Sequence, residues 1–145
     1  MVTISILTKT TKKHLDELNG LMDQLRSYQK KKEHSSLSDL NNMVGNKSST
    51  LVVAKDNDRI IGTAVLSVAE RIGRRVGHID DVIVSEEYRG QGLGEKIMRK
   101  VVTIARTKKL TSLKLTSRPS RVAAHRLYEK LGFEKKETEV FGLKL

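Results

Sequence analysis

Apolar and polar residues alternate in several segments of the chain and recur at helical spacing in others. The alternating segments predict strands at Thr3–Leu7, Thr50–Ala54, Ile60–Val68, Val76–Ser85, Leu113–Thr116 and within the closing segment Phe133–Leu145. The helical spacing predicts helices at Lys12–Arg26, from Ser36 or Ser38 to Gly45, at Gly92–Lys108 and at Arg121–Leu131. The predicted order is therefore β-α-α-β-β-β-α-β-α-β.

This order of elements is typical of a mixed α/β fold. The polar turn Asp56-Asn57-Asp58 separates two strands and predicts a β-hairpin. The polar run Lys30–Ser36 predicts a loop, and neither a linker nor an internal repeat divides the chain. We therefore expect a single domain over residues 1–145.

Composition excludes several classes of function. Hydrophobic residues make up 37% and charged residues 31% of the 145 positions, and no apolar run has the length of a membrane span. The sequence has no cysteine, which excludes disulfides, thiol catalysis and cysteine-ligated zinc. Its 4 histidines lack metal-ligand spacing. We expect a cytoplasmic protein with neither a membrane segment nor a metal site.

The formal net charge of +11 indicates an anionic partner or a basic surface that favours solubility. A nucleic acid and a phosphorylated cofactor or substrate both fit this charge. Stacking platforms for bases are scarce, because the chain has only 3 Tyr, 2 Phe and no Trp. The basic residues are also spread over every segment, so nucleic acid is the disfavoured partner.

The most informative motif is the run Arg-Gly-Gln-Gly-Leu-Gly from Arg89 to Gly94. It follows the apolar run Val82–Val84 and precedes a predicted helix, so unshielded backbone N–H groups lie at the positive end of a helix dipole. Such a turn suits a pyrophosphate. No Gly-Lys-Ser/Thr follows, and the glycine spacing differs from that of the dinucleotide-binding fingerprint. A tight turn without a ligand is the alternative.

A second motif runs from Ala124 to Phe133 and predicts a helix that Gly132 ends. Tyr128 lies beside the apolar face of this helix, where it can expose its hydroxyl or simply fill the core. The run Arg89–Gly94 matches the Q/R-x-x-G-x-G/A signature of the GNAT superfamily of N-acetyltransferases. The Ala124–Phe133 motif resembles the second cofactor-side motif of that superfamily, whose element order is also the one predicted here.

This resemblance implies a mixed, largely antiparallel sheet that is splayed in the middle and flanked by about four helices. It implies acetyl-CoA as the cosubstrate, with its pyrophosphate held by the backbone amides of Arg89, Gly90, Gln91, Gly92, Leu93 and Gly94. The pantetheine arm would pair with the main chain of Val82, Ile83 and Val84. The resemblance also puts Arg121, Ala124 and Lys130 beside the cofactor, and Lys130 or Arg126 would reach its 3′-phosphate. Tyr128 would protonate the leaving thiolate.

One residue departs from the family pattern. Arg121 stands where the family motif often has Asn, and its guanidinium offers a phosphate contact in place of one cofactor hydrogen bond. Since the chain has no cysteine for an acyl-enzyme, we expect direct transfer in a ternary complex.

The base that deprotonates the amine has several candidates. Asp80 and Asp81 share a strand, and adjacent strand residues point to opposite faces, so we expect at most one of them to face the cleft. Glu70 on the preceding strand is a third candidate, and a water relay is a fourth. A structural or surface role stays open for each acid.

The acceptor is left open as a small-molecule or peptide amine. The segment Gly77–Val84, with Tyr88–Gly90, also resembles the corresponding strand of glucosamine-6-phosphate N-acetyltransferases, so an amino-sugar acceptor is one alternative. A non-catalytic acyl-CoA-binding or interaction module is the alternative from another class. Members of the family are often dimers, so a homodimer is also open.

Overall fold

The computed structural model describes residues 1–145 and contains one sheet and four α-helices. The strands are β1 (Val2–Ile6), β2 (Ser49–Asp56), β3 (Arg59–Arg71), β4 (Arg74–Val84) and β5 (Ser112–Lys114). The helices are α1 (Lys12–Leu25), α2 (Leu37–Gly45), a short 3₁₀ helix η1 (Glu86–Tyr88), α3 (Leu93–Thr107) and α4 (Val122–Lys130).

Local capping explains where the first two helices begin. The Thr11 side chain accepts a hydrogen bond from the backbone N–H of His14 at the start of α1. At α2, Ser36 and Asp39 form a reciprocal capping box, which selects Ser36 over Ser38 as the cap. Both signals are local, so the sequence predicted these helices within a residue or two.

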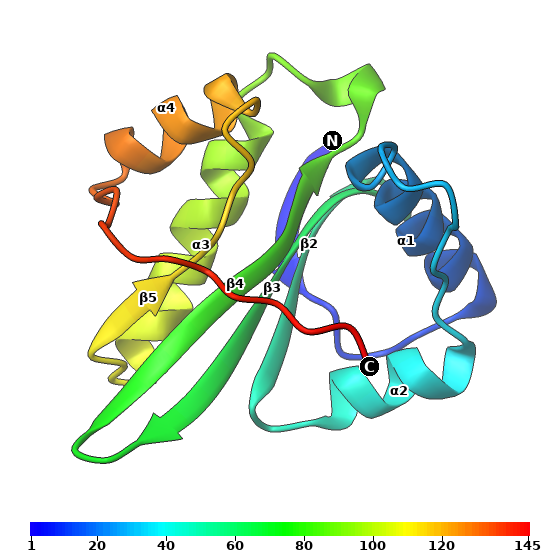
Figure 1. Ribbon diagram of the computed structural model, residues 1–145. Helices are drawn as coiled ribbons and strands as arrows, with labels where there is room; N and C mark the ends of the chain where they lie inside the picture. The colour runs from blue at the N-terminus through cyan, green and yellow to red at the C-terminus, as the bar shows by residue number, and fades with distance from the viewer.

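The strands lie in the order β1-β2-β3-β4-β5, and helices cover both faces of the sheet (Figure 1). The first four strands are antiparallel, and β5 runs parallel to β4. Leu15, Leu18 and Leu21 of α1 and Leu40 of α2 pack with one face of the sheet. The other face packs against α3 and Tyr128 of α4. The predicted mixed α/β fold class is confirmed.

The sheet opens between β4 and β5. β5 pairs with β4 only over Val76–His78 and then turns away towards α4 (Figure 1). The rest of β4, Ile79–Val84, has no neighbouring strand on that side. The predicted splay is therefore present, and it leaves a free main-chain edge.

A β-bulge interrupts β4 where its two aspartates lie. Val65 of β3 pairs with Asp80 and Thr63 pairs with Ile83, so Ala64 alone is opposite both Asp81 and Val82. Asp81 adopts a left-handed backbone with φ 53°, a conformation that Asp tolerates better than most residues.

The bulge also changes which way the two aspartates point. Asp80 lies on the same face as its partner Val65, which packs with α1 and α2, and Asp81 lines a cavity on that face. Only Asp81 lines the cavity, so the expectation that at most one of the pair faces the cleft stays a prediction. The strict alternation on which it rested fails at a bulge.

The predicted strand within Phe133–Leu145 is absent, and the segment forms no regular structure. The stretch from Glu134 to Glu139 is mostly charged, and β5 is only 3 residues long. The alternating end of the chain therefore has no partner strand, and Phe141 is 92% exposed. An alternating pattern without a neighbouring edge does not make a strand.

Candidate functional site

The glycine-rich turn between β4 and α3 depends on backbone conformations that favour glycine. Gly90 and Gly92 have φ of 78° and 77°, and Gly92 is the N-cap of α3. A Cβ added at either position would meet no atom within 4 Å, so the turn is open on its outer side. These glycines are therefore required by conformation and leave the main chain accessible.

The backbone N–H groups from Gly90 to Glu95 have no acceptor within the protein. The first helical bond of α3 is from Lys96 N–H to the Gly92 carbonyl, and no side chain caps Gly92. A run of unpaired donors at a helix N-terminus is a ready site for an anion.

A carboxylate beside this turn is already neutralised. Glu95 in the first turn of α3 forms an ion pair with Lys130 of α4 at 2.5 Å and lies 3.6 Å from Arg99. The hydrogen bond from Lys130 holds the pKa of Glu95 below its usual value. Lys130, predicted on the cofactor side, thus lies next to the turn and removes a charge that would repel an anion.

Two arginine side chains donate hydrogen bonds to main-chain carbonyls at the end of β4. Arg121, the N-cap residue of α4, donates from Nη2 to the Val82 carbonyl at 3.4 Å. Arg89 donates from Nε to the Val84 carbonyl at 3.0 Å. The structure therefore brings the predicted segments Val82–Val84 and Arg89–Gly94 together with the start of α4.

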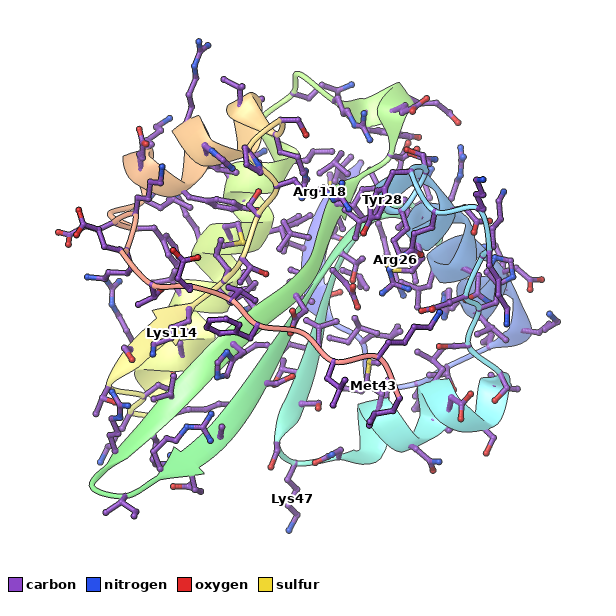
Figure 2. The ribbon with its side chains drawn as sticks, viewed as in Figure 1. Arg26, Tyr28, Met43, Lys47, Lys114 and Arg118 are labelled. Carbon is purple, nitrogen blue, oxygen red and sulfur yellow. The ribbon has the colours of Figure 1, made fainter.

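Asp81 lies between this edge and α1. Its carboxylate accepts from Arg26 Nη2 at 3.0 Å, and it lines a cavity of about 60 Å³ whose other walls include Met22, Leu40 and Met43. Figure 2 shows Arg26 at the end of α1 beside β4. Asp80, one residue earlier, is exposed. The acids thus differ, since Asp81 is half-buried and paired.

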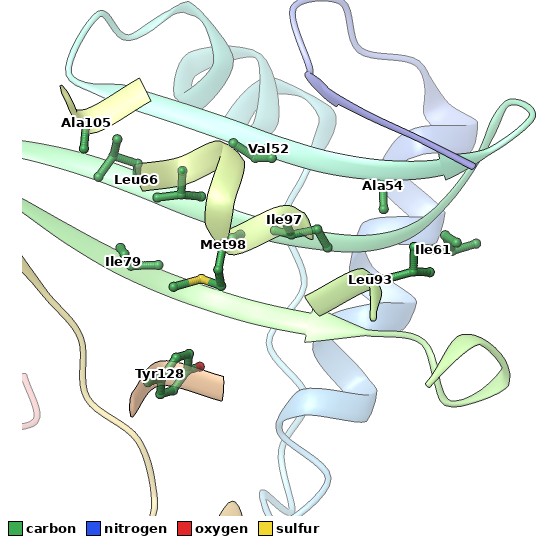
Figure 3. Packing of buried hydrophobic residues seen from close by; sticks show 12 residues of the cluster. Val52, Ala54, Ile61, Leu66, Ile79, Leu93, Ile97, Met98, Ala105 and Tyr128 are labelled. Atoms are coloured by element: carbon green, nitrogen blue, oxygen red, sulfur yellow. The ribbon is translucent and has the colours of Figure 1, made fainter. Parts of the chain in front are cut away.

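Tyr128 lies on the opposite face of the sheet, in the cluster with Ile79 and Met98 (Figure 3). Tyr128 is 6% exposed, and its ring centroid lies 6.0 Å from that of Phe133. Burial raises the pKa of its phenol above 10.0, and the Arg121 charge offsets part of this rise. The hydroxyl has no partner in the protein and is not fully buried. The phenol therefore stays protonated at neutral pH.

Glu70 is not brought to this site. It pairs with Arg75 at the far end of the β3–β4 hairpin, where Arg75 Nε donates to its carboxylate at 2.7 Å. Arg75 precedes Asp80 by five positions on β4, which is about 17 Å at the rise of a strand. Ala124, by contrast, is half-buried on α4 and packs against the cluster that contains Tyr128.

Sequence reasoning missed Arg26, Tyr28 and Arg118. The Arg118 guanidinium lies 3.4 Å from the centroid of the Tyr28 ring, joining the loop after α1 to the loop after β5. These residues belong to no motif, and the contacts join distant parts of the sequence. No local spacing signals them.

No helix in the structure is long and apolar enough to cross a membrane.

The model of the Acetyltransferase (GNAT) family matches residues 18–133, most of the chain. The glucosamine 6-phosphate N-acetyltransferase of Trypanosoma brucei brucei is 38% identical over 85 residues, which cover 57% of this chain and 56% of that protein. N-acetyltransferase 8B of Rattus norvegicus is 28% identical over 113 residues, covering 76% and 51%. The chain spans little more than half the length of these curated relatives.

Solved structures share the whole fold. An acetyltransferase of Trypanosoma brucei aligns over 100% of both chains with a TM-score of 0.78 and 28% identity. An aminoglycoside acetyltransferase from an uncultured soil metagenomic sample aligns over 99% of this chain and 96% of its own, with a TM-score of 0.88. At 16% identity, the latter likeness concerns the fold alone.

Proposed function

The chain belongs to the Acetyltransferase (GNAT) family, and we propose that it transfers the acetyl group of acetyl-CoA to a primary amine by direct attack in a ternary complex. One observation carries this proposal. The unpaired amides of Gly90–Glu95 adjoin the free edge of β4, so one continuous surface offers donors for a pyrophosphate and main chain for an extended arm.

Acetyl-CoA fits this surface by chemistry and by position. Its pyrophosphate is assigned to the amides that follow Arg89, at the N-terminus of α3, and its pantetheine arm to the edge at Val82–Val84. Lys130 keeps Glu95 neutralised beside the pyrophosphate. Arg121 holds the Val82 carbonyl at the mouth of the splay, which orients the edge that receives the arm.

The transfer step needs a base, an oxyanion donor and an acid. The neutral amine attacks the thioester carbonyl, a C–N bond forms, and the C–S bond breaks as the thiolate leaves. A main-chain N–H of Val82–Val84 stabilises the oxyanion, and Tyr128 gives its phenolic proton to the thiolate. The raised pKa of Tyr128 suits this role, because the group must hold its proton until the thiolate forms.

The amine loses its proton to a carboxylate on the other face of β4 or to water. Asp81 lies nearest to the free edge, since it forms the bulge beside Val82, but its carboxylate is already engaged by Arg26 Nη2 at 3.0 Å. Asp80 is exposed and unpaired, and it takes the proton directly or through water. Glu70, at the hairpin tip, has no part in this proposal.

The test is an assay of CoA thiol release over a panel of amines, amino acids, amino sugars and peptide N-termini, with mass spectrometry of the products. Glucosamine 6-phosphate belongs in the panel, because it is named for three relatives, one from Trypanosoma brucei brucei and two from Oryza sativa subsp. japonica. Acetylated product with matching thiol release supports the proposal. Acetyl-CoA binding without turnover on any amine points to the non-catalytic module instead.

The cytoplasmic location and the homodimer belong to the proposal as well. Fractionation of cells that express the chain tests the location. Sedimentation analysis of the purified chain tests the dimer, with a 16.3 kDa monomer as the contrary result.

A further inference from the structure

The free edge of β4 is bridged by two loops at the level of the bulge. Arg118, in the loop after β5, stacks on the ring of Tyr28, in the loop after α1. Arg26, two residues before Tyr28, donates to Asp81 of the bulge. Figure 2 shows Arg118, Tyr28 and Arg26 gathered beside β4. An acceptor that reaches the edge from the α1 side passes these side chains.

Charges of both signs are left unpaired there. Arg118 contacts the Tyr28 ring and Arg121 the Val82 carbonyl, and neither guanidinium has a carboxylate partner. Asp80 is exposed on the same face of β4 as its partner Val65, and it has no cationic partner either. A binding surface with separate unpaired charges of opposite sign is complementary to a ligand that carries both.

Unpartnered polar atoms flank the stack. Oε1 of Gln29, next to Tyr28 in sequence, and Oγ of Ser117, next to Arg118, are buried without a hydrogen-bond partner. Buried polar atoms are rarely left unsatisfied in proteins, so a ligand or water that supplies their partners is expected at this place. This observation is independent of the charges and points to the same loops.

We propose that the acceptor is an amine that also carries an anionic group, a carboxylate or a phosphate. The guanidinium of Arg118, fixed in orientation by the Tyr28 ring, binds the anionic group. Asp80 holds the ammonium before deprotonation, and Gln29 and Ser117 complete the polar contacts. This inference rests on the proposed acetyl transfer and narrows its substrate class.

The same arrangement disfavours polycationic acceptors. A polyamine would set additional positive charges against Arg118 and Arg121, and bringing like charges together is unfavourable. The net charge of +11 extends this repulsion over the surface. Spermidine is therefore expected to be a poor acceptor.

The experiment compares acceptors that differ only in the anionic group. Phenylalanine and phenethylamine differ by a carboxylate, and O-phosphoethanolamine and ethanolamine differ by a phosphate, so the two pairs distinguish the two anionic groups. For the unmodified chain we expect kcat/KM to be at least tenfold higher for the anionic member of one pair. Arg118→Gln should remove this preference through a higher KM for the anionic members and leave kcat/KM for the neutral members within twofold. Arg118→Lys should restore part of the preference.

Two controls separate recognition from simple bridging of the loops. Arg74→Gln removes the same charge at the distant hairpin tip and should leave every ratio unchanged. Tyr28→Leu removes the stack and should weaken the preference less than Arg118→Gln does. Equal kcat/KM within both pairs, or equal losses for anionic and neutral acceptors in Arg118→Gln, would overturn the inference while acetyl transfer still stands. Failure of every acceptor and of acetyl-CoA binding would instead overturn the proposed function.

Discussion

Removal of the Tyr128 hydroxyl tests the acid step without disturbing the fold. The ring fills the cluster on the α3 face of the sheet, while the hydroxyl has no protein partner. Tyr128→Phe therefore keeps the packing, and the free energy of unfolding should change by less than about 0.5 kcal/mol. A general acid contributes at least about 100-fold to a rate, so kcat should fall by about two orders of magnitude, or about 2.7 kcal/mol of barrier.

The assay is steady-state thiol release with saturating acetyl-CoA, and thermal unfolding is followed on the same samples. KM for acetyl-CoA should stay within about threefold, because the hydroxyl acts on the leaving group. The alkaline limb of kcat in the unmodified chain should lie above pH 10.0, since burial raises the pKa of this phenol from that value.

Tyr88→Phe is the matched control. The Tyr88 hydroxyl donates to Asp56 at 2.7 Å, so its loss should lower the melting temperature and leave kcat unchanged. The two variants thus differ in which quantity responds. An unchanged kcat in Tyr128→Phe, with the control behaving as expected, would refute the acid role.

Three further changes test other parts of the structure. Gly92→Ala forces a side chain into φ 77°, which should cost about 1–2 kcal/mol of folding stability and also lower the affinity for CoA measured by calorimetry. Gly73→Ala is the control: at φ 78° in the hairpin, it should lower the stability by a similar amount and leave the CoA affinity intact. Gly77→Ala puts a Cβ 2.6 Å from Leu113 Cδ2 and should destabilise the protein by about 1–3 kcal/mol in thermal unfolding. Gly45→Ala, whose Cβ would meet nothing within 4 Å, should not destabilise it, and equal melting temperatures for the two variants would contradict the packing of β5 on β4. The pKa of Glu95 in the folded state is lowered from 4.5, so the ion pair stabilises the protein fully above pH 4.5 and its contribution is lost as the pH falls through the lower folded-state pKa. Glu95→Gln should therefore reduce the fall in melting temperature at acid pH. An unaltered pH profile in this variant would argue against the pair with Lys130.

Features with a local cause could be predicted from the sequence. Thr11 and Ser36 begin helices through hydrogen bonds to residues three positions later, and periodicity marks the faces that each helix buries. The glycine turn is equally local, because its conformation depends on Gly90 and Gly92 themselves. These elements lie within a few residues of their predicted bounds.

Features that depend on a distant partner could not be predicted. The bulge at Asp81 exists because β3 and β4 pair out of step, and this puts both aspartates on one face. The Arg26–Asp81 ion pair joins residues 55 positions apart, and no spacing rule reaches that far. The terminal strand failed for the same reason, since the segment from Val140 to Leu145 pairs with no strand of the sheet.

The central claim is that the amides at the start of α3 hold the pyrophosphate of acetyl-CoA. The most direct measurement is a ¹⁵N NMR titration of the chain with CoA and, separately, with pantetheine, which lacks the pyrophosphate. The account predicts that CoA shifts the amide signals of Gly90–Glu95 strongly, and that pantetheine leaves them nearly unmoved while it shifts Val82–Val84. Equal responses to both ligands, or CoA binding that leaves the Gly90–Glu95 amides unshifted, would contradict it.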